Sequence, residues 1–271
     1  DRYMQAPGST IIRYAPDSGE LTRYDPPVPH AYIQALALDE SRRCLYGLCF
    51  PPEYLISWDL DTHETEILAL IGSGYGGMTQ GENICLDSEG CCWTNWSLTR
   101  AWQDHPGPDM HRLARYDPGR GEMIFFQQGL PWPDGREGFA RPEAYFNLGD
   151  GQMYASGAGG ALYRIDPATG QARFLFRAIG DEGRGRRSRL AAMTTGPDGL
   201  AYAVTGRDGE CEVLRFDPRT ENYELLGELG DDESGEAAWQ VHDVCITPDG
   251  MLYAAENDNP HRSGYLWEVE L

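Results

Sequence analysis

The sequence contains no long apolar run. A membrane-spanning helix needs about 20 consecutive apolar residues, and no stretch of the chain approaches that length. The chain also shows no charged-then-apolar leader, and it begins at Asp1 without Met. We therefore expect a soluble protein with no visible signal peptide and no membrane partner, although a processed or truncated start could have removed such a peptide.

Cysteine motifs are lacking as well. The seven cysteines form no Cys-x-x-Cys motif, and an odd number cannot be fully paired in disulfides. Most of them lie in apolar strand patterns, where cysteine behaves as a small hydrophobic residue. This usage favours a reducing compartment over an oxidising one.

Basic residues are scarce compared with acidic ones. The chain has 22 Lys and Arg residues against 43 Asp and Glu residues, and its formal net charge is -21 at pH 7. A surface of that sign repels phosphate groups, which argues against nucleic acid and against an anionic membrane surface as partners. The excess acid is expected to form a solvated surface, and a local basic pocket remains compatible with it.

Several catalytic signatures are missing. The chain has no His-Glu-x-x-His, no Gly-x-Ser-x-Gly, and no phosphate-binding loop that ends in Lys-Ser or Lys-Thr. The segment NDNPH, 257–261, resembles an oxygen-rich calcium loop. Pro260 and the missing acidic twelfth position argue against an EF-hand there.

What the sequence does contain is a repeat. One half is a strand, an Asp-Pro-type turn and another strand, as in LYRIDPATGQARFL, with copies that begin at Ile11, Leu55, Leu113, Leu162 and Val213. The other half is a buried strand, a tight turn and a strand rich in Tyr or Trp, as in DVCITPDGMLYAAE, with copies from Ala35, Asn83, Ala144, Ala191 and Asp243. Pro, Asp and Gly each favour the turn for a separate reason: a preset φ, a side-chain bond to the backbone, and tolerance of positive φ.

The two halves combine into four-stranded units that recur about every 50 residues, which predicts an all-β fold, a β-propeller whose strands we name a to d from the axis outward. A sandwich or a solenoid would space its strands differently. Five to six repeats are visible in a single domain, near residues 11–24, 32–70, 81–128, 143–176, 190–228 and 241–271. The first supplies only strands c and d, and the last only a, b and c. Either Leu21–Tyr24 closes a five-bladed ring, or the chain is part of a six- or seven-bladed one.

The connections differ between the two faces of such a propeller. The a–b and c–d turns are short and rich in Asp, Gly and Pro. The long irregular segments are nearly all b–c or d–a connections, which share the other face: 71–80, 97–111, 128–141, 178–189, 229–240 and 257–263. Binding residues concentrate on loops of a rigid scaffold, so we expect the site on that face.

Polar and ionisable residues stand at the starts of strands a and the ends of strands b on the same face. Converging His, carboxylate and Arg groups with aromatic walls are typical of a site for a sugar, a lactone or a metal-assisted reaction. We expect substrate contacts from Glu82, Asn83, Trp96, Arg100, Trp102, Arg141 and Glu143. Each has a structural alternative: the carboxylates can bond neighbouring strand ends, the tryptophans can pack at the rim, and His30 and His242 can be satisfied by backbone carbonyls.

With Pro-Asp-Gly turns, strands b that read LAYAV or MLYAAEN, and hairpins that read LYRIDPATGQ, the chain resembles the streptogramin-lyase-like and gluconolactonase/regucalcin-like propellers over nearly all its length. The resemblance implies six or seven blades and, at the channel mouth, a divalent cation (Ca²⁺, Mg²⁺ or Zn²⁺) or a catalytic His/Glu set. Glu256 and His242 look most like such a set, and Asp243 and His261 are the further metal ligands that we expect.

The chain is also similar to some seven-bladed polysaccharide lyases. That resemblance implies a His, a Tyr and an Arg that remove a proton next to a uronic acid carboxylate, and the corresponding roles fall to His242, His30, Tyr75 and Arg189.

Two hypotheses about function follow. The first is a lyase or a lactonase-like hydrolase that acts on a small molecule or an oligosaccharide, with a His base and an Arg or a metal that stabilises the anion formed. The second is a non-catalytic propeller that presents the same face to a protein or a glycan. The fold does not choose between them, because propellers serve both purposes.

Overall fold

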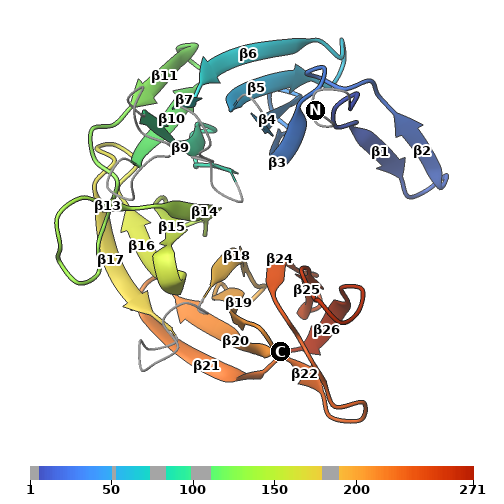
Figure 1. The fold of residues 1–271 in the computed structure, drawn as a ribbon, viewed down its shortest axis with the longest axis vertical. Coiled ribbons are helices and arrows are strands. Elements are labelled where there is room, and N and C mark those ends of the chain that lie inside the picture. The colour runs from blue at the N-terminus through green and yellow to red at the C-terminus, as the bar shows by residue number, and fades with distance from the viewer. Residues whose placement is uncertain (1–5, 51–52, 74–83, 99–110, 179–188) are drawn as a thin grey trace.

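The structure, a computed structural model, describes residues 6–50, 53–73, 84–98, 111–178 and 189–271. Its strands form five blades of antiparallel sheet arranged around an axis, as Figure 1 shows, which confirms the prediction of an all-β propeller. Across these ranges, helix is limited to the single 3-10 turn η2 (Ala158–Gly160). No helix in this part of the chain is long and apolar enough to cross a membrane.

Each blade runs outward from the axis in sequence order. The first blade is β3 (Tyr32–Asp39), β4 (Cys44–Phe50), β5 (Tyr54–Asp59) and β6 (Thr65–Leu70). The second is β8 (Cys85–Leu86), β9 (Cys92–Leu98), β10 (Arg112–Asp117) and β11 (Glu122–Phe125). The short strand β7 (Gly72–Ser73) pairs in parallel with β9. The third is β14 (Pro142–Asn147), β15 (Met153–Gly157), β16 (Ala161–Ile165) and β17 (Ala172–Arg177). The fourth is β18 (Leu190–Thr195), β19 (Ala201–Arg207), β20 (Glu210–Asp217) and β21 (Asn222–Glu228), and the fifth is β24 (Val241–Ile246), β25 (Met251–Glu256) and β26 (Leu266–Glu270).

The repeated Asp at the end of strand c closes the c–d turn. Asp117, Asp166 and Asp217 each accept a hydrogen bond at Oδ1 from the backbone N–H two residues later, at 2.9 Å in each blade. This local bond fixes the direction in which strand d returns. The Asp-Pro repeat of the sequence is therefore a turn device and not a catalytic motif.

The core lies between the blades. Leu162 and Phe176 of the third blade pack with Leu190 and Leu214 of the fourth, and similar clusters join the other neighbouring pairs. An inner blade thus buries both faces of its sheet, and every residue of β15 is buried. This packing holds the starts of strands a in fixed positions around the axis.

The ring of described strands is open between the fifth blade and the first (Figure 1). On one side, β26 is the last strand of a three-stranded sheet. On the other side, β1 (Ile12–Ala15) and β2 (Glu20–Arg23) pair only with each other. The prediction of a c–d hairpin without inner partners is confirmed.

Candidate functional site

Strand a slips in register near its start in four blades. In the fourth blade Ala191 and Ala192 are skipped, between Leu190 and Met193, and in the other three blades a polar residue is left out of the ladder. The ladder slips between Ile33 and Ala35, between Pro142 and Ala144, and between Val241 and Asp243. The skipped residues are Gln34, Glu143 and His242, each half-buried. A bulge re-aims the side chain that it leaves out of the ladder and is common next to active sites. The three blades therefore present a polar side chain at equivalent places beside the channel.

Three side chains surround the imidazole of His242. Its Nε2 lies 3.0 Å from Nη1 of Arg189, 2.7 Å from Nε2 of Gln240 and 3.4 Å from Oδ2 of Asp258. Gln240 also donates to Asp258 at 3.3 Å. The structure thus brings together Arg189 and His242, as the sequence predicted, and adds Gln240 and Asp258.

The imidazole of His242 meets both donors and an acceptor. The guanidinium of Arg189, which has only donors, lies 3.0 Å from Nε2 and 3.5 Å from Nδ1. The carboxylate of Asp258, which has only acceptors, lies 3.4 Å from Nε2. The unprotonated ring can accept from Arg189 at Nε2, and the protonated ring can donate to Asp258.

The backbone of two connections holds this cluster. The carbonyl of Gln240 accepts from the N–H of Asn257 at 2.8 Å, so the d–a and b–c connections run side by side. The carbonyl of Arg189 accepts from Gly206 at 3.0 Å. Asp258 adopts a left-handed backbone conformation with φ of 57°, which is uncommon outside Gly and concentrates at functional sites.

Glu256 has a different environment. Its carboxylate, whose side chain is fully buried, accepts five hydrogen bonds, from the backbone N–H groups of Trp239 and Tyr265 and from the side chains of Asn259, Arg262 and Trp267. Burial by itself raises the pKa of this carboxyl, but the bonds from Arg262, Asn259 and the backbone outweigh it and lower the pKa to about 2. Glu256 is an anionic anchor for the b–c connection 257–265.

The predicted metal ligands do not gather around a common point. Both oxygens of Glu256 are occupied, and a cation there would adjoin the guanidinium of Arg262. Asp243 is exposed and accepts from the N–H of Val244, and the His261 ring is 5.5 Å from that of Trp239. In the described ranges, no three His, Cys, Asp or Glu side chains are arranged to hold an ion. These four residues do not fit a metal ion in this arrangement, and the divalent cation stays a prediction.

Other sequence candidates have structural contacts. His30 bonds the carbonyl of Ala6 through Nδ1 at 2.6 Å and stands two residues before β3 of the first blade. Trp96 donates to the carbonyl of Phe126 at 3.1 Å and packs against Phe125. Arg141 and Glu143 are half-buried at the start of the third blade. Tyr75, Glu82, Asn83, Arg100 and Trp102 lie outside the described residues.

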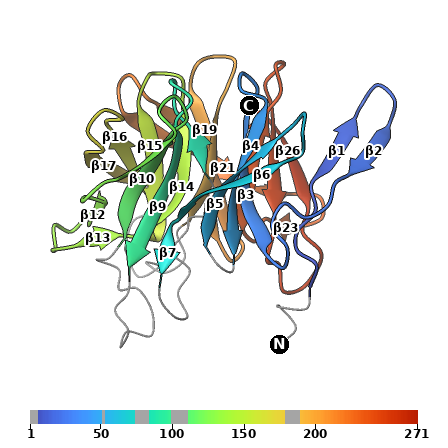
Figure 2. The same cartoon turned by 90° about the horizontal axis from the view of Figure 1, so that it is seen from above.

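The long connection 128–141 lies on the face where the sequence predicts it. The segment 128–141 forms the hairpin β12 (Leu130–Pro131) and β13 (Phe139–Ala140), which leads directly into the start of β14 (Figure 2). It therefore shares the face on which strand b ends at Glu256 and β24 begins. Most of 97–111 lies outside the described residues.

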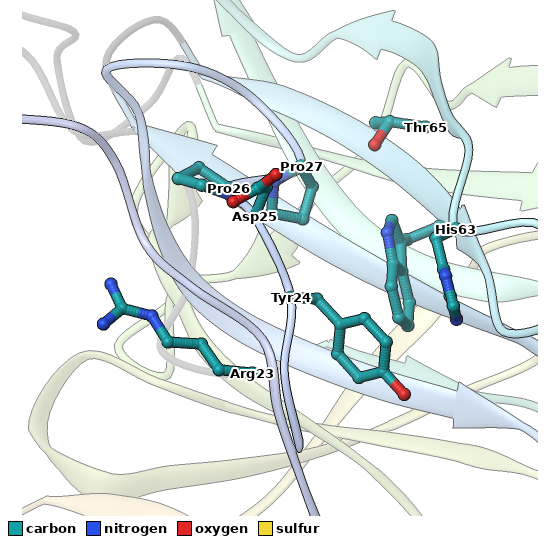
Figure 3. Close-up of a pocket in the computed structure, with 8 residues that line it drawn as sticks. Arg23, Tyr24, Asp25, Pro26, Pro27, His63 and Thr65 are labelled. Carbon is teal, nitrogen blue, oxygen red and sulfur yellow. The ribbon is translucent and has the colours of Figure 1, made fainter.

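A cavity of about 410 Å³ lies elsewhere, at the root of the β1–β2 hairpin (Figure 3). Its wall includes Tyr24, Trp58 and His63, whose rings pack against one another with centroids 4.5 to 5.2 Å apart. None of the groups around His242 lines it. We place the candidate site at the channel mouth because the polar side chains converge there. The aromatic rings at the cavity pack against one another.

Sequence reasoning missed Gln240 and Asp258. Gln240 stands two residues before His242, and Asp258 stands in the segment read as an unsuitable calcium loop. Their pairing depends on two connections that meet only in the folded chain. The available signal was the pair of polar residues Gln240 and His242, two positions apart where strand β24 begins.

Comparisons with known proteins bear on the fold. No protein-family model matches the chain, and no curated protein matches it. Among solved structures, a protein named as a 6-phosphogluconolactonase from Bacteroides uniformis superimposes with a TM-score of 0.59 and 18% identity, over 96% of this chain and 76% of that one. A gluconolactonase from Xanthomonas campestris gives a TM-score of 0.56 and 12% identity, over 83% and 70%.

A third similar structure is much longer. It is the extracellular domain of a protein named as a one-component system from B. thetaiotaomicron, with a TM-score of 0.55 and 13% identity, and the match covers 83% of this chain but only 26% of that one. Identities this low show the fold alone. The chain thus shares the propeller fold of gluconolactonase-like proteins, in agreement with the resemblance read from its sequence.

Proposed function

We propose that the chain is a carbohydrate- or lactone-active enzyme, a lyase or a hydrolase, with its site at the channel mouth around His242. The observation that carries this proposal is the placement of the imidazole between a cation and a carboxylate. Its Nε2 lies 3.0 Å from Nη1 of Arg189 and 3.4 Å from Oδ2 of Asp258. A neutral imidazole with a lone pair next to both a cation and a carboxylate is suited to act as a general base.

The proton transfer has a defined sequence in this geometry. A substrate C–H next to a carboxylate, or a water that attacks a lactone carbonyl, replaces the donors at Nε2 and loses its proton to that nitrogen. The new Nε2–H can then donate to Asp258, which stabilises the imidazolium. Arg189 loses its acceptor at the same moment and can bond the oxygen on which negative charge develops. In an elimination the C–O bond to the leaving group breaks as the double bond forms, and in a lactone hydrolysis the ring C–O bond breaks. In either case the imidazolium returns its proton to the leaving oxygen.

The local charge supports a polar or anionic small substrate. The chain carries a formal charge of -21, yet Arg141 and Arg189 stand at the starts of neighbouring blades on this face, with Arg189 only 9% exposed. Arginine binds carboxylates through paired donors, which suits an aldonic or uronic acid group. The shared fold with proteins named as lactonases is consistent with a substrate of this class.

The test is an assay with a panel of sugar lactones and uronic-acid oligosaccharides, followed by lactone loss or by the ultraviolet absorbance of unsaturated product. With a substrate in hand, His242→Ala should lower kcat about 10² to 10⁴-fold. Glu228→Gln, on the exposed outer strand β21, is the matched control and should leave kcat unchanged. A fully active but destabilised His242→Ala protein would remove His242 from the mechanism.

The alternative is a binding propeller without catalysis. It is favoured by the skipped residues Gln34 and Glu143, whose amide and carboxylate groups at the mouth can bond a ligand without any proton transfer. This alternative predicts calorimetric binding of a sugar acid with no turnover. Binding weakened by His242→Ala in the absence of any product would favour it over the enzyme.

A further inference from the structure

One position of the repeat differs in the first blade. The next three blades each place an arginine of strand c directly opposite the aromatic residue of strand b: Arg115 with Trp93, Arg164 with Tyr154, and Arg215 with Tyr202. In the first blade the same cross-strand position pairs Ser57 with Tyr46. The first blade therefore has a short hydroxyl side chain where its neighbours have a guanidinium.

The arginines of the second and third blades bridge to the next blade. Nη1 of Arg115 donates to the carbonyl of Pro167 at 2.7 Å, in the c–d turn of the third blade. Nη1 of Arg164 donates to Oε1 of Glu221 at 2.9 Å, in the c–d turn of the fourth. A guanidinium thus occupies the space between two blades at the end where the turns lie.

A cavity of about 370 Å³ lies at the equivalent place between the first and second blades. Tyr46 and Ser57 of the first blade and Tyr116 of the second line it, and the two tyrosine rings are 5.8 Å apart. Its position at the c–d turn of the first blade puts it on the face opposite the channel mouth. The cavity is the space that an arginine at position 57 would fill.

The charge around this cavity is negative. Among the described residues, its lining contains no arginine or histidine, but it does contain the carboxylates of Asp59, Glu64 and Glu66. Glu66 lies directly opposite Ser57 on strand d, as Glu224 lies opposite Arg215 in the fourth blade. Arg215 and Glu224 form an ion pair. The first blade thus keeps the carboxylate of such a pair without the guanidinium.

The arginines of the adjoining a–b turn are engaged outside the cavity. Arg42 pairs with Asp39 at 2.8 Å, and Arg43 pairs with Asp61 at 2.6 Å. Neither arginine lines the cavity. Within the described residues, the missing cation is therefore not replaced by a side chain from this turn.

Tyr46 is engaged differently from its equivalent in the third blade. Tyr154 donates to Oδ2 of Asp150, the aspartate of its a–b turn, at 2.7 Å. The hydroxyl of Tyr46, a residue that is 2% exposed, lies instead beside the thiol of Cys44 in the wall of the cavity. A phenolic hydroxyl can accept as well as donate, so Tyr46 can accept a hydrogen bond from a cationic ligand.

We infer that this cavity binds a small guanidinium compound. The guanidinium of the ligand takes the place that an arginine side chain has in the other blades, against Tyr46 and Tyr116, and donates to Glu66. Guanidinium suits the site better than ammonium because its planar fork matches a carboxylate and its flat face packs on aromatic rings. The surrounding carboxylates disfavour a ligand with an acidic end, which favours agmatine over arginine. This inference does not depend on the proposed function at the channel mouth.

The first test is calorimetric titration of the full 271-residue chain with agmatine and, separately, with cadaverine. Both compounds carry two positive charges, so the comparison separates guanidinium recognition from the general attraction of a chain with a formal charge of -21. Agmatine should bind at one site about tenfold more tightly than cadaverine. Equal affinities, or no binding of agmatine at millimolar concentration, overturn the proposal.

Two substitutions locate the site. Ser57→Arg restores the residue of the other blades and should abolish agmatine binding, with circular dichroism showing that the fold is retained. Glu66→Gln, which leaves the cavity unfilled, should weaken binding about fivefold. Glu228→Gln, on the exposed strand β21, is the matched control and should leave the affinity unchanged. A folded Ser57→Arg variant that still binds agmatine overturns the proposal, as do equal losses for Glu66→Gln and Glu228→Gln.

Cys44 reports on the same site in the wild-type chain. Its half-buried thiol lies in the wall of the cavity, whereas Cys245 is exposed on the fifth blade. Saturating agmatine should slow the alkylation of Cys44 by a maleimide, measured by mass spectrometry, and leave the rate at Cys245 unchanged. An unchanged rate at Cys44, or equal slowing of both thiols, overturns the proposal.

Discussion

The guanidinium of Arg262 lies across the carboxylate of Glu256, with Nη1 2.7 Å from Oε2, while its plane covers the ring of Tyr265 at 3.6 Å. Arg262 also reaches Glu236, so a single cation joins the b–c connection of the fifth blade to the hairpin β22 (Gly230–Asp231) and β23 (Glu236–Ala237) that precedes it. This pair holds the segment that carries Asp258. It links the stability of the blade to the shape of the candidate site.

Arg262→Ala should lower the free energy of unfolding by about 3 kcal/mol, because it leaves the buried carboxylate of Glu256 without its cation. Urea unfolding followed by tryptophan fluorescence measures the loss. Arg219→Ala is the control, since Arg219 pairs with Asp217 while 74% exposed, and such pairs contribute about 0.2 to 1 kcal/mol. Equal losses for the two variants would contradict the assigned role of Glu256.

Acid should destabilise the protein through Glu256. Its pKa is lowered from 4.5 to about 2 in the fold, so its contribution to stability is fully present above the unfolded value and is lost as the pH falls toward 2. Glu256→Gln removes that dependence. The gap in unfolding free energy between wild type and this variant should narrow from pH 6 to pH 3, and a constant gap would show that Glu256 does not titrate as proposed.

Asp258→Asn should reduce kcat far less than His242→Ala does. The Asp258 side chain is 62% exposed, and an exposed ion pair contributes about 1 kcal/mol at most, which corresponds to about fivefold in rate. Steady-state kinetics on the substrate found in the panel measures it, with KM expected to change little. A loss as large as that of His242→Ala would mean that Asp258 itself contacts the substrate.

Gly206→Ala should damage both the fold and the site. Gly206 has φ of +102°, and an added Cβ would overlap the carbonyl of Glu210. The same residue donates to the carbonyl of Arg189. We expect a loss of about 3 kcal/mol, against about 1 kcal/mol for Gly199→Ala, where φ is +78° and no atom lies within 4 Å. Thermal melting compares the two.

The strands and turns of this protein were predictable because their causes are local. Asp217 closes its turn through a bond to a residue two positions later, and the apolar residues Leu162, Tyr163 and Ile165 before the next such turn are visible without any partner. The three strands a, b and c expected within 241–271 are therefore observed as β24, β25 and β26.

The site was only partly predictable because it depends on pairing. The pair Arg189 and His242 was expected from the starts of two strands, but whether they touch depends on how neighbouring blades pack. Whether a residue such as Glu143 is skipped in the ladder depends on the register of two strands, which alternation alone does not fix. The five donors of Glu256 come mainly from the folded connection after it, so its role as an anchor could not be read from its position.

The bulged positions also have a consequence for how such a protein can change its preference. Gln34, Glu143 and His242 are left out of ladders that resume in register immediately afterwards, so the framework on either side does not depend on what they carry. Randomising the codons of Gln34 and Glu143 while His242 is kept would vary the chemistry of the mouth without removing the proposed base. A library of that design would sample new specificities through the first and third blades.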